Sequence, residues 1–527
     1  MEHDDGLRTD ERAGTGERAL PAAARELLSH VRLITASNRG PVEFTHEPDG
    51  TFTTRRGTGG VVTAISAIGR YTDAIWIASA MTEGDRARAL LADDLGEEVI
   101  APPDTDFRLR FVVSDPDAYD GYYNRIANPL LWFLQHYLWD TPRAPDIDFG
   151  TWAAWYDGYV VVNEEFADEI LRVADASAHP PLVMLQDYHL YLVPGQLRAA
   201  RPDMILQQFV HIPWPDPDYW RLIPGEMRRA ICESLLANDI VGFQTPGHAR
   251  SFMYTCEANL DGVDIGYRSG MVTYRGRTTW VRDYPISIDI DAVLKVADSE
   301  DARRHEEHVK GFLNDYTLVR VDRAEPSKNI VRGFLAYDRM LEEHPELIGH
   351  VNFLAFLVPS RLEVAEYVDY LDDINTVVGR ISTKYANVAE TDGVAWQPIH
   401  VFIGDDYPRA LSAMKHYDAL LVNPIFDGMN LVAKEGALLN ERDGVLVLSE
   451  GAGAFQQLGA HALSVAPTDI EGTARALYTA LTMPHEQRAE HARALRRLVI
   501  EQDILTWIYR QLEDLTTTAS GRSLIRG

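Results

Sequence analysis

Short runs of apolar and β-branched residues alternate with helix-length segments along most of the chain, in two separate series. The first series gives candidate strands at 31–37, 74–80, 109–114, 181–187, 205–212 and 240–245. The second gives candidate strands at 317–322, 350–358, 400–404, 419–424, 444–450 and 461–467. Runs that are apolar on both faces and separated by helices are typical of parallel sheets covered by helices on both sides. The two series therefore predict an α/β protein with two doubly wound domains.

Changes in composition along the chain predict where these domains begin and end. Residues 1–28 are rich in Asp, Glu, Arg and Gly and lack a hydrophobic period, so we expect a disordered acidic tail there. Near residue 290 a Pro-containing extended stretch passes into a polar helical one, which predicts domains at 29–290 and 291–485. The segment 486–515 has the pattern of one or two long helices.

Charge and cysteine content exclude several classes of protein. The 527 residues include 50 Lys and Arg against 79 Asp and Glu, a formal net charge of −29, which argues against a protein that coats nucleic acid or an anionic membrane. Two cysteines make neither a disulfide framework nor a four-thiolate zinc site, and no apolar stretch is long enough to span a bilayer. We expect a soluble cytoplasmic protein with no nucleic-acid or membrane partner, and homo-oligomer formation stays open.

Ligands of open α/β sheets bind beyond the carboxyl ends of the strands, so the chemistry is sought in five short segments there. In the first segment Arg39 follows a strand, and a helical pattern comes after three glycines, Gly57, Gly59 and Gly60. Glycines and the free N–H groups of a helix N-terminus suit an anion. A tight turn would use the same residues, and the sequence leaves both interpretations open.

The second and third segments suit a sugar. Tyr123 and Trp132 lie among asparagines, and aromatic faces with amide partners bind sugars, although helix packing is the more common reason for such a pattern. Asp187 and His189 follow one strand and His211 ends the next. We rank hydrogen bonding to a substrate above capping of a strand end, and metal binding last, because no further ligand cluster accompanies these residues.

The fourth and fifth segments suit a nucleotide. Arg323 and Lys328 lie five residues apart across a turn, where two cations could hold a diphosphate and neutralise charge that develops as it leaves. A solvated basic turn is the alternative. Asp427 ends a strand before a helix that contains Glu435, and a carboxylate at such a place suits the diol of a ribose, although many such residues are plain surface groups.

Taken together and in order, eight pieces of the chain resemble the retaining glycosyltransferase family that contains the trehalose-6-phosphate synthases. The pieces are SNRGP, GTGG, YYNRIANPLLW, QDYHLYLVPGQLR, HIPWP, SKNIVRGFLAY, PSR and DGMNLVAKE. The resemblance implies the GT-B arrangement, two Rossmann-like domains facing each other across a cleft, with the C-terminal helix at 486–515 crossing back to the first domain. It also implies transfer of glucose from UDP-glucose or GDP-glucose to glucose 6-phosphate, which forms trehalose 6-phosphate with retention and needs no metal or other cofactor.

The resemblance assigns roles to the matching positions. It implies that the acceptor is bound by Arg39, Tyr123, Trp132, Asp187 and Arg361. It implies that the donor diphosphate is bound by Gly59, Gly60, Arg323 and Lys328, and the donor sugar and ribose by Asp427, Gly428, Met429, Asn430, Leu431 and Glu435. The implied catalytic set is Asp187, His211, Arg323 and Lys328.

No carboxylate stands out as a covalent nucleophile, so retention of the anomeric configuration is best explained by front-face substitution. In such a reaction the leaving diphosphate accepts the proton of the acceptor hydroxyl. Three departures from the family pattern leave the acceptor and the base open. Ser79 stands where an acceptor-facing Trp is common, Glu-Pro-Ser fills the turn before Lys328, and Phe426 stands where an Arg is usual. Glycerol 3-phosphate or a cyclitol phosphate is therefore an alternative acceptor. A non-catalytic sugar-phosphate sensor is a further alternative, disfavoured because the charged residues are all present.

Overall fold

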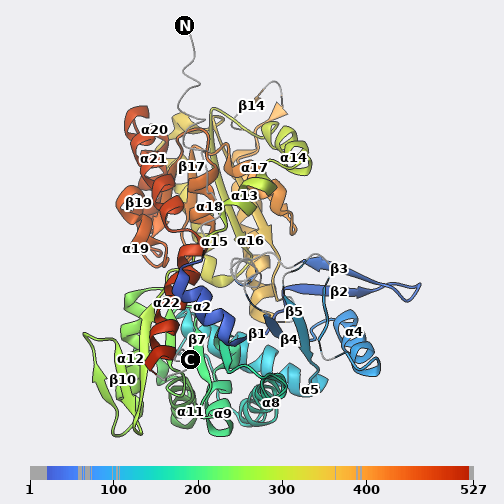
Figure 1. Ribbon diagram of the computed structural model, residues 1–527. Coiled ribbons are helices and arrows are strands. Elements are labelled where there is room, and N and C mark those ends of the chain that lie inside the picture. The colour runs from blue at the N-terminus through green and yellow to red at the C-terminus, as the bar shows by residue number, and fades with distance from the viewer. Residues whose placement is uncertain are drawn as a thin grey trace.

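Two β-sheets organise the molecule, one in each half of the chain (Figure 1). The computed structural model describes residues 20–56, 62, 65, 72, 74–97, 99–102, 105, 107–361, 364–386, 388, 390, 391 and 394–521. Both sheets have parallel cores with helices packed on both faces, which confirms the predicted α/β class.

The first sheet has nine strands in the order β5-β4-β1-β6-β7-β8-β11-β10-β9. Their bounds are β1 (Arg32–Ser37), β4 (Ile75–Ser79), β5 (Arg108–Val112), β6 (Pro181–Gln186), β7 (Ile205–Phe209), β8 (Ile240–Phe243), β9 (Asp264–Gly266), β10 (Met271–Tyr274) and β11 (Arg277–Asp283). Pairing is parallel from β5 to β11 and antiparallel on both sides of β10. The chain builds outward from β1 in both directions, so the strand order reverses between β1 and β6, where sheets of this kind bind ligands.

The helices of the first half follow from apolar residues at helical spacing. In α8, for example, Val162, Phe166, Ile170 and Val173 face the sheet and are buried. The helical elements are α2 (Ala22–His30), α4 (Glu83–Asp94), α5 (Pro116–Asp120), η1 (Gly121–Trp132), α6 (Phe133–Gln135), α7 (Phe149–Ala153), η2 (Ala154–Val160), α8 (Val161–Asp175), η3 (Tyr188–Leu190), α9 (Val193–Ala200), α10 (Pro217–Trp220), α11 (Gly225–Leu235) and α12 (Pro246–Asn259). Both η1 and η2 are wound as π-helices, a form that often occurs at functional sites.

The second sheet has six parallel strands in the order β16-β13-β12-β17-β18-β19. Their bounds are β12 (Tyr316–Arg323), β13 (Val351–Val358), β16 (Ile399–Ile403), β17 (Ala419–Val422), β18 (Val445–Ser449) and β19 (Leu463–Val465). The order again reverses once, between β12 and β17, as in a dinucleotide-binding fold. This second reversal places the segments after β12 and β17 side by side.

Helices cover both faces of the second sheet. They are α13 (Ile290–Ala297), α14 (Glu300–Lys310), η4 (Pro326–Lys328), α15 (Ile330–Glu343), η5 (Pro345–Leu347), α16 (Ala365–Tyr385), α17 (Tyr407–Met414), α18 (Val432–Leu439), α19 (Phe455–Leu458), η6 (Gly459–His461), α20 (Ile470–Thr482), α21 (His485–Glu501) and α22 (Ile504–Gly521). Within the described ranges, none of the helices combines the length and hydropathy needed to cross a membrane.

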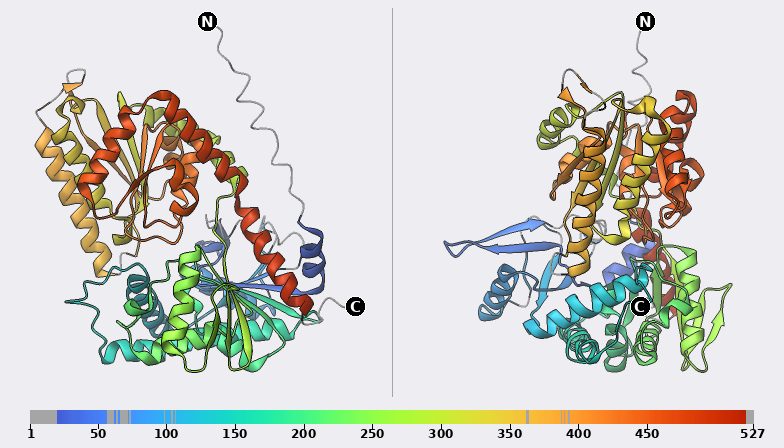
Figure 2. Two further views of the ribbon diagram at one scale, coloured as in Figure 1. Left: turned by 90° about the vertical axis from the view of Figure 1, so that its left-hand side faces the viewer. Right: turned by 180° about the vertical axis from the view of Figure 1, so that it is seen from behind.

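The C-terminal segment contains two helices, and only the second crosses back to the first sheet (Figure 2). Helix α21 stays on the second sheet, where Arg488 donates a hydrogen bond to the carbonyl oxygen of Arg442 at 2.7 Å. Helix α22 returns, and its Gln511 accepts a hydrogen bond of 2.6 Å from Gln207 on β7. The single segment expected to cross at 486–515 is thus corrected: the chain bends after α21, and α22 makes the crossing.

The tail predicted at 1–28 is wrong from residue 20 onward, and residues 1–19 lie outside the described residues. Helix α2 begins at Ala22 and packs against α22, as Figure 1 shows. Leu20, Leu27 and Leu28 are at most 1 % exposed. These apolar residues recur at helical spacing, but the charged residues before them mask the pattern in the sequence.

Two small antiparallel hairpins were not predicted from the sequence. A hairpin of β2 (Val42–His46) and β3 (Phe52–Arg56) precedes the glycine-rich segment, and a second one joins β14 (Glu390–Thr391) to β15 (Val394–Ala395). The first hairpin rests on α4, where the Asp85 carboxylate accepts a hydrogen bond of 2.9 Å from the backbone N–H of Phe44. Its strands bury one face only, so they lack the continuous apolar runs used to find the other strands.

Candidate active site

Loops from the carboxyl ends of the two sheets meet, and this meeting point holds most of the predicted site residues. A Cβ atom on Gly428 would lie 1.8 Å from the carbonyl oxygen of His211, so only glycine lets these two backbones approach so closely. The Tyr137 and Phe426 rings lie 4.5 Å apart across the same junction. Phe426, one of the departures from the family pattern, therefore packs an aromatic ring against the first half of the chain.

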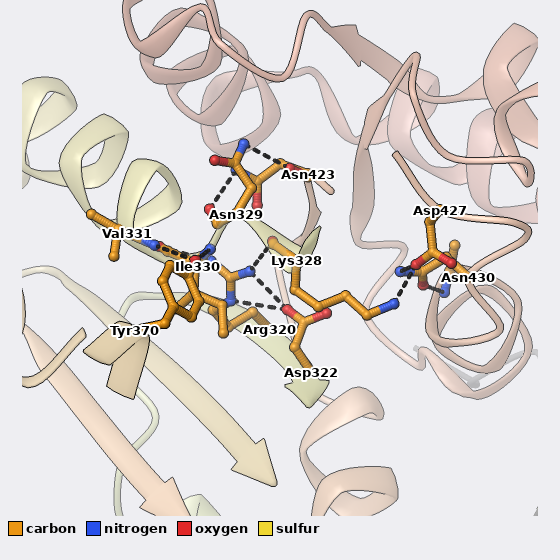
Figure 3. A network of polar contacts seen from close by, with 11 residues as sticks. Arg320, Asp322, Lys328, Asn329, Ile330, Val331, Tyr370, Asn423, Asp427 and Asn430 are labelled. Carbon is orange, nitrogen blue, oxygen red and sulfur yellow. Dashed lines mark hydrogen bonds and ion pairs between the residues drawn. The ribbon is translucent and has the colours of Figure 1, made fainter. Parts of the chain in front are cut away.

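Lys328 and Asp427 form an ion pair between the segments that follow β12 and β17 (Figure 3). Their side chains are 12 % and 14 % exposed. The Asn430 amide also donates to Asp427, at 3.1 Å. Burial acts to raise the pKa of Asp427, but the neighbouring Lys328 outweighs it and holds the pKa below its usual value. Asp427 is therefore ionised, and Lys328 is fixed beyond the carboxyl ends of β12 and β17.

A second group of charges surrounds Glu325, whose side chain is fully buried. Its Oε1 atom lies 3.3 Å from Arg323 Nε and 3.6 Å from a guanidinium nitrogen of Arg361, and it accepts a hydrogen bond of 3.2 Å from Ser360. Burial acts to raise the pKa of Glu325, but Arg323 and Arg361 hold it below its usual value. One carboxylate thus holds two cations, Arg323 at the end of β12 and Arg361 three residues after β13.

The indole ring of Trp132, at the end of η1, is packed between charged and aromatic groups. It stacks on His136 with ring centres 3.9 Å apart, and the Arg361 guanidinium carbon lies 4.1 Å from the ring centre. Its Nε1 atom is buried and has no hydrogen-bond partner among the described residues. The ring therefore packs within the protein, and its N–H is left without a partner among the described residues.

Asp187 and His211 come from the ends of neighbouring strands and contact each other. Asp187 has a φ of 72°, and its carboxylate accepts a hydrogen bond of 3.1 Å from the backbone N–H of His211. Burial raises the pKa of Asp187 to about 7. Burial lowers the pKa of His211 to about 3, so its ring is neutral, and its Nε2 atom lies 2.9 Å from Gln186 Oε1.

Arg39, Tyr123 and Ser79 differ in how they are placed relative to these charges. Arg39 is 64 % exposed, and its guanidinium lies 3.7 Å from the Glu43 carboxylate. Tyr123 stacks between other rings, 5.9 Å from His189. Ser79 is buried and donates a hydrogen bond of 3.0 Å to Asn38. Gly59 and Gly60 lie outside the described residues.

Glu435 lies apart from these charges, beside a small hollow of about 70 Å³ in the second half of the chain. Tyr407 lines this hollow together with Val321, Phe356, Val358, Phe402 and Asp406. The Tyr407 hydroxyl donates a hydrogen bond of 2.9 Å to Glu435. Burial raises the pKa of Glu435 to about 7. The hollow is mostly apolar and is edged by the carboxylates of Asp405 and Asp406.

The sequence assigned no role to three further residues of the site. Glu325 stands in the predicted turn but was not identified as a buried anchor. His136, whose Nδ1 atom lies 2.8 Å from the carbonyl oxygen of Trp132, is one helical turn beyond that residue. Tyr188 follows Asp187 directly, accepts a hydrogen bond of 3.4 Å from Arg361 and donates one of 2.7 Å to Asn128. A search of the predicted segments at helical spacing would have found His136. Among the described residues, no group of three or more His, Cys, Asp and Glu side chains is arranged to hold a metal ion.

Comparison with known proteins decides the family. The pattern of glycosyltransferase family 20 matches residues 31–517. The chain belongs to glycosyltransferase family 20. It is a glycosyltransferase of the α,α-trehalose-phosphate synthase family, which confirms the resemblance drawn from the motifs.

Relatives and solved structures match over nearly their whole length. A trehalose-6-phosphate synthase of Mycobacterium sp. (strain KMS) is 32% identical over 94% of this chain and 96% of its own, and one of Mycobacterium marinum is 33% identical over 95% and 97%. An E. coli structure bound with UDP-2-fluoro glucose superposes with a TM-score of 0.77 at 26% identity, over 92% of this chain and 99% of its own. A Burkholderia xenovorans α,α-trehalose-phosphate synthase in complex with glucose-6-phosphate gives 0.76 at 26% identity, over 92% and 99%. These matches confirm the GT-B fold.

Proposed function

We propose that this protein transfers glucose from UDP-glucose or GDP-glucose to glucose 6-phosphate and forms trehalose 6-phosphate with retention of configuration. The observation that carries the proposal is the meeting of Lys328, Asp427 and Arg323 from the second half of the chain with Asp187, His211 and Trp132 from the first. In this arrangement, residues 291–485 provide the donor site and residues 29–290 provide most of the acceptor site.

The donor site has cations and backbone N–H groups that can bind a nucleotide-glucose. Lys328 and Arg323 supply two cations for the diphosphate. The backbone N–H groups of residues 428–431 donate hydrogen bonds to no other described residue, so they remain available for sugar hydroxyls or phosphate oxygens. The Asp427 carboxylate accepts from the glucose hydroxyls, Glu435 accepts from the ribose, and the hollow beside Tyr407 takes the base.

The acceptor site is built for a phosphorylated sugar. Arg361 is fixed by Glu325 and Tyr188, and the unpaired N–H of Trp132 lies beside it. Both groups donate to a phosphate, and Tyr123 flanks the sugar. Arg39 completes the phosphate site when its side chain turns away from Glu43. The Arg39 side chain is exposed, so it has room for this movement.

The reaction follows from these positions. The bond from the donor C1 to the diphosphate oxygen breaks, and a bond from C1 to an acceptor hydroxyl oxygen forms on the same face. The hydroxyl proton passes to the departing diphosphate oxygen. Lys328 and Arg323 stabilise the charge that develops on that oxygen, so the step needs no metal. His211 is neutral because burial lowers its pKa to about 3, and it acts by hydrogen bonding to the donor sugar rather than by giving up a proton.

The test is to incubate purified protein with UDP-glucose or GDP-glucose and, separately, glucose 6-phosphate, glycerol 3-phosphate or a cyclitol phosphate. Release of nucleotide and the anomeric NMR signals of the product are followed together. We expect release that depends on glucose 6-phosphate and an α,α-linked product. Faster turnover with another acceptor would overturn the acceptor assignment and point to Ser79. Binding without turnover would mean a sensor.

A further inference from the structure

Arg320, on β12, lies beneath the turn that carries Lys328 (Figure 3). Its side chain is completely buried, with 0% exposure. It donates to the Asp322 carboxylate at 2.7 and 3.1 Å. It also donates to the carbonyl oxygens of Lys328 and Ile330, each at 3.2 Å. The guanidinium therefore ties the backbone on both sides of residue 329 to the sheet.

The packing around Arg320 leaves room for this side chain and for little else. A Cβ atom on Gly333, in the first turn of α15, would lie 2.4 Å from a guanidinium nitrogen of Arg320. Glycine at this position is thus required for the guanidinium to reach the two carbonyl oxygens.

Other polar groups hold the same turn from neighbouring elements (Figure 3). Asn329 has a φ of 57°, a left-handed conformation that an asparagine tolerates. Its side-chain amide donates to the carbonyl oxygens of Asn423 at 3.0 Å and Pro467 at 2.6 Å. The N–H of Ile330 donates to the Tyr370 hydroxyl at 2.6 Å. With its backbone held by these bonds, the turn presents the Lys328 side chain in one direction, toward Asp427.

A buried ion pair is a poor way to gain stability, because an apolar side chain of similar volume packs at lower desolvation cost. A planar donor group aimed at two backbone carbonyl oxygens does fix the geometry of a turn. We propose that Arg320 is a positioning residue that sets the place of Lys328 and thereby the affinity for the donor diphosphate. This inference rests on the proposed function, since it takes Lys328 to bind that diphosphate.

A double-mutant cycle tests the inference. The variants are Arg320→Met, Lys328→Ala and the pair, and the readouts are kcat/KM for the nucleotide-glucose, KM for glucose 6-phosphate, and Kd for UDP and GDP. We expect Arg320→Met to lower donor kcat/KM and nucleotide affinity about 10- to 100-fold, the usual effect of losing a group that orients a ligand-binding residue. In the Lys328→Ala background the same change should cost less than about 2-fold, because the group through which Arg320 acts is gone. The KM for glucose 6-phosphate should stay unchanged.

The first half of the chain provides a matched control. Arg198 is also buried, donates to Asp239 at 2.9 Å and donates to backbone carbonyl oxygens, but it lies outside the candidate active site. Arg198→Met should lower the melting temperature without coupling to Lys328. If Arg320→Met does not fold, Arg320→Lys replaces it in the same cycle, since lysine keeps a charge for Asp322 but cannot reach both carbonyl oxygens.

The outcomes separate the two proposals. If Arg320→Met lowers donor kcat/KM by the same factor in the wild type and in Lys328→Ala, the positioning role is wrong. The proposed function is unaffected by that result. Wild-type donor turnover in Lys328→Ala overturns the diphosphate assignment, and the positioning role falls with it. If Arg320→Met causes a large loss of donor kcat/KM when Lys328 is present and a small loss in Lys328→Ala, both proposals are supported.

Discussion

Burial decides the charge state of individual residues in this site. Asp427 keeps its charge because Lys328 lies beside it, and Glu325 keeps its charge because two guanidinium groups face it. Glu435 has no cation beside it among its described contacts and receives only the hydroxyl of Tyr407, so burial raises its pKa to about 7. Carboxylates of the same site thus differ in pKa because their surroundings differ.

The first prediction concerns the two donor cations. Lys328→Ala or Arg323→Ala should lower kcat/KM by about 10²-fold or more, because each removes charge that stabilises the departing diphosphate. Steady-state kinetics with saturating glucose 6-phosphate measure this. Lys384→Ala, in the same half of the chain but paired at the surface with Asp338 and Glu342, is the control and should stay close to wild type. Near-normal kcat/KM in both site variants would refute the assignment.

The second prediction concerns pH. A carboxylate accepts hydrogen bonds from a ribose diol better than a carboxylic acid does, so ionisation of Glu435 should strengthen nucleotide binding. Because burial raises the pKa of Glu435 to about 7, affinity for UDP or GDP should increase as pH rises through that value. Calorimetric titrations at several pH values measure it. In Glu435→Gln the nucleotide still titrates, so the difference between the two profiles belongs to Glu435. Parallel profiles would show that Glu435 does not face the nucleotide.

At the scale of elements, α18 joins the donor site to the linker between the sheets. Lys434 precedes Glu435, is 2% exposed, and donates a hydrogen bond of 2.7 Å to the carbonyl oxygen of Ile286. Burial lowers the pKa of Lys434 to about 7. The helix that begins after the free N–H groups of residues 428–431 is therefore anchored to the linker by a lysine that has no carboxylate among its described contacts.

This anchor carries the third prediction. Between the folded pKa of about 7 and the unfolded value near 10.5, the unfolded chain binds the Lys434 proton and the folded protein does not. The contribution of Lys434 to stability should therefore increase as pH rises from 7 toward 10. Denaturant unfolding of wild type and Lys434→Met over this range measures it, with the methionine variant lacking that part of the slope. Arg339→Met, an exposed cation on α15, should keep the wild-type slope.

The molecule as a whole carries a net charge of −29, yet both proposed substrates are anions. Arg323, Lys328 and Arg361 are brought together by the fold, and Arg39 lies nearer the surface. The arrangement predicts a positive site within a negative surface.

The fourth prediction follows from that contrast. Because close cations bind the phosphate, KM for glucose 6-phosphate should rise with ionic strength, and Arg361→Met should raise KM and flatten its dependence on salt. Kinetics at several sodium chloride concentrations measure this, with uncharged viscosity-matched buffers as control. A KM that falls with salt in the wild type would mean that the negative surface dominates.

Local pattern predicted much of the fold and part of the site. Each predicted strand has an observed counterpart, because a buried parallel strand leaves a continuous apolar run that needs no distant partner to be recognised. The hairpin of β2 and β3 and the helix α2 were missed, since one buries a single face and the other follows a charged stretch. The strand-end rule found Arg323, Lys328, Asp187 and Asp427, but it could not show which of them meet.

The sequence by itself determined the two doubly wound sheets, the segments at their strand ends and the family, because periodicity and short motifs are local properties. Only the tertiary structure decided that Lys328 pairs with Asp427, 99 residues away, that the Trp132 ring is occupied by His136 and Arg361, and that α22 crosses back. These features depend on burial and on contacts between distant segments. Both are set when the sheets pack together, and neither leaves a trace in the spacing of residues along the chain.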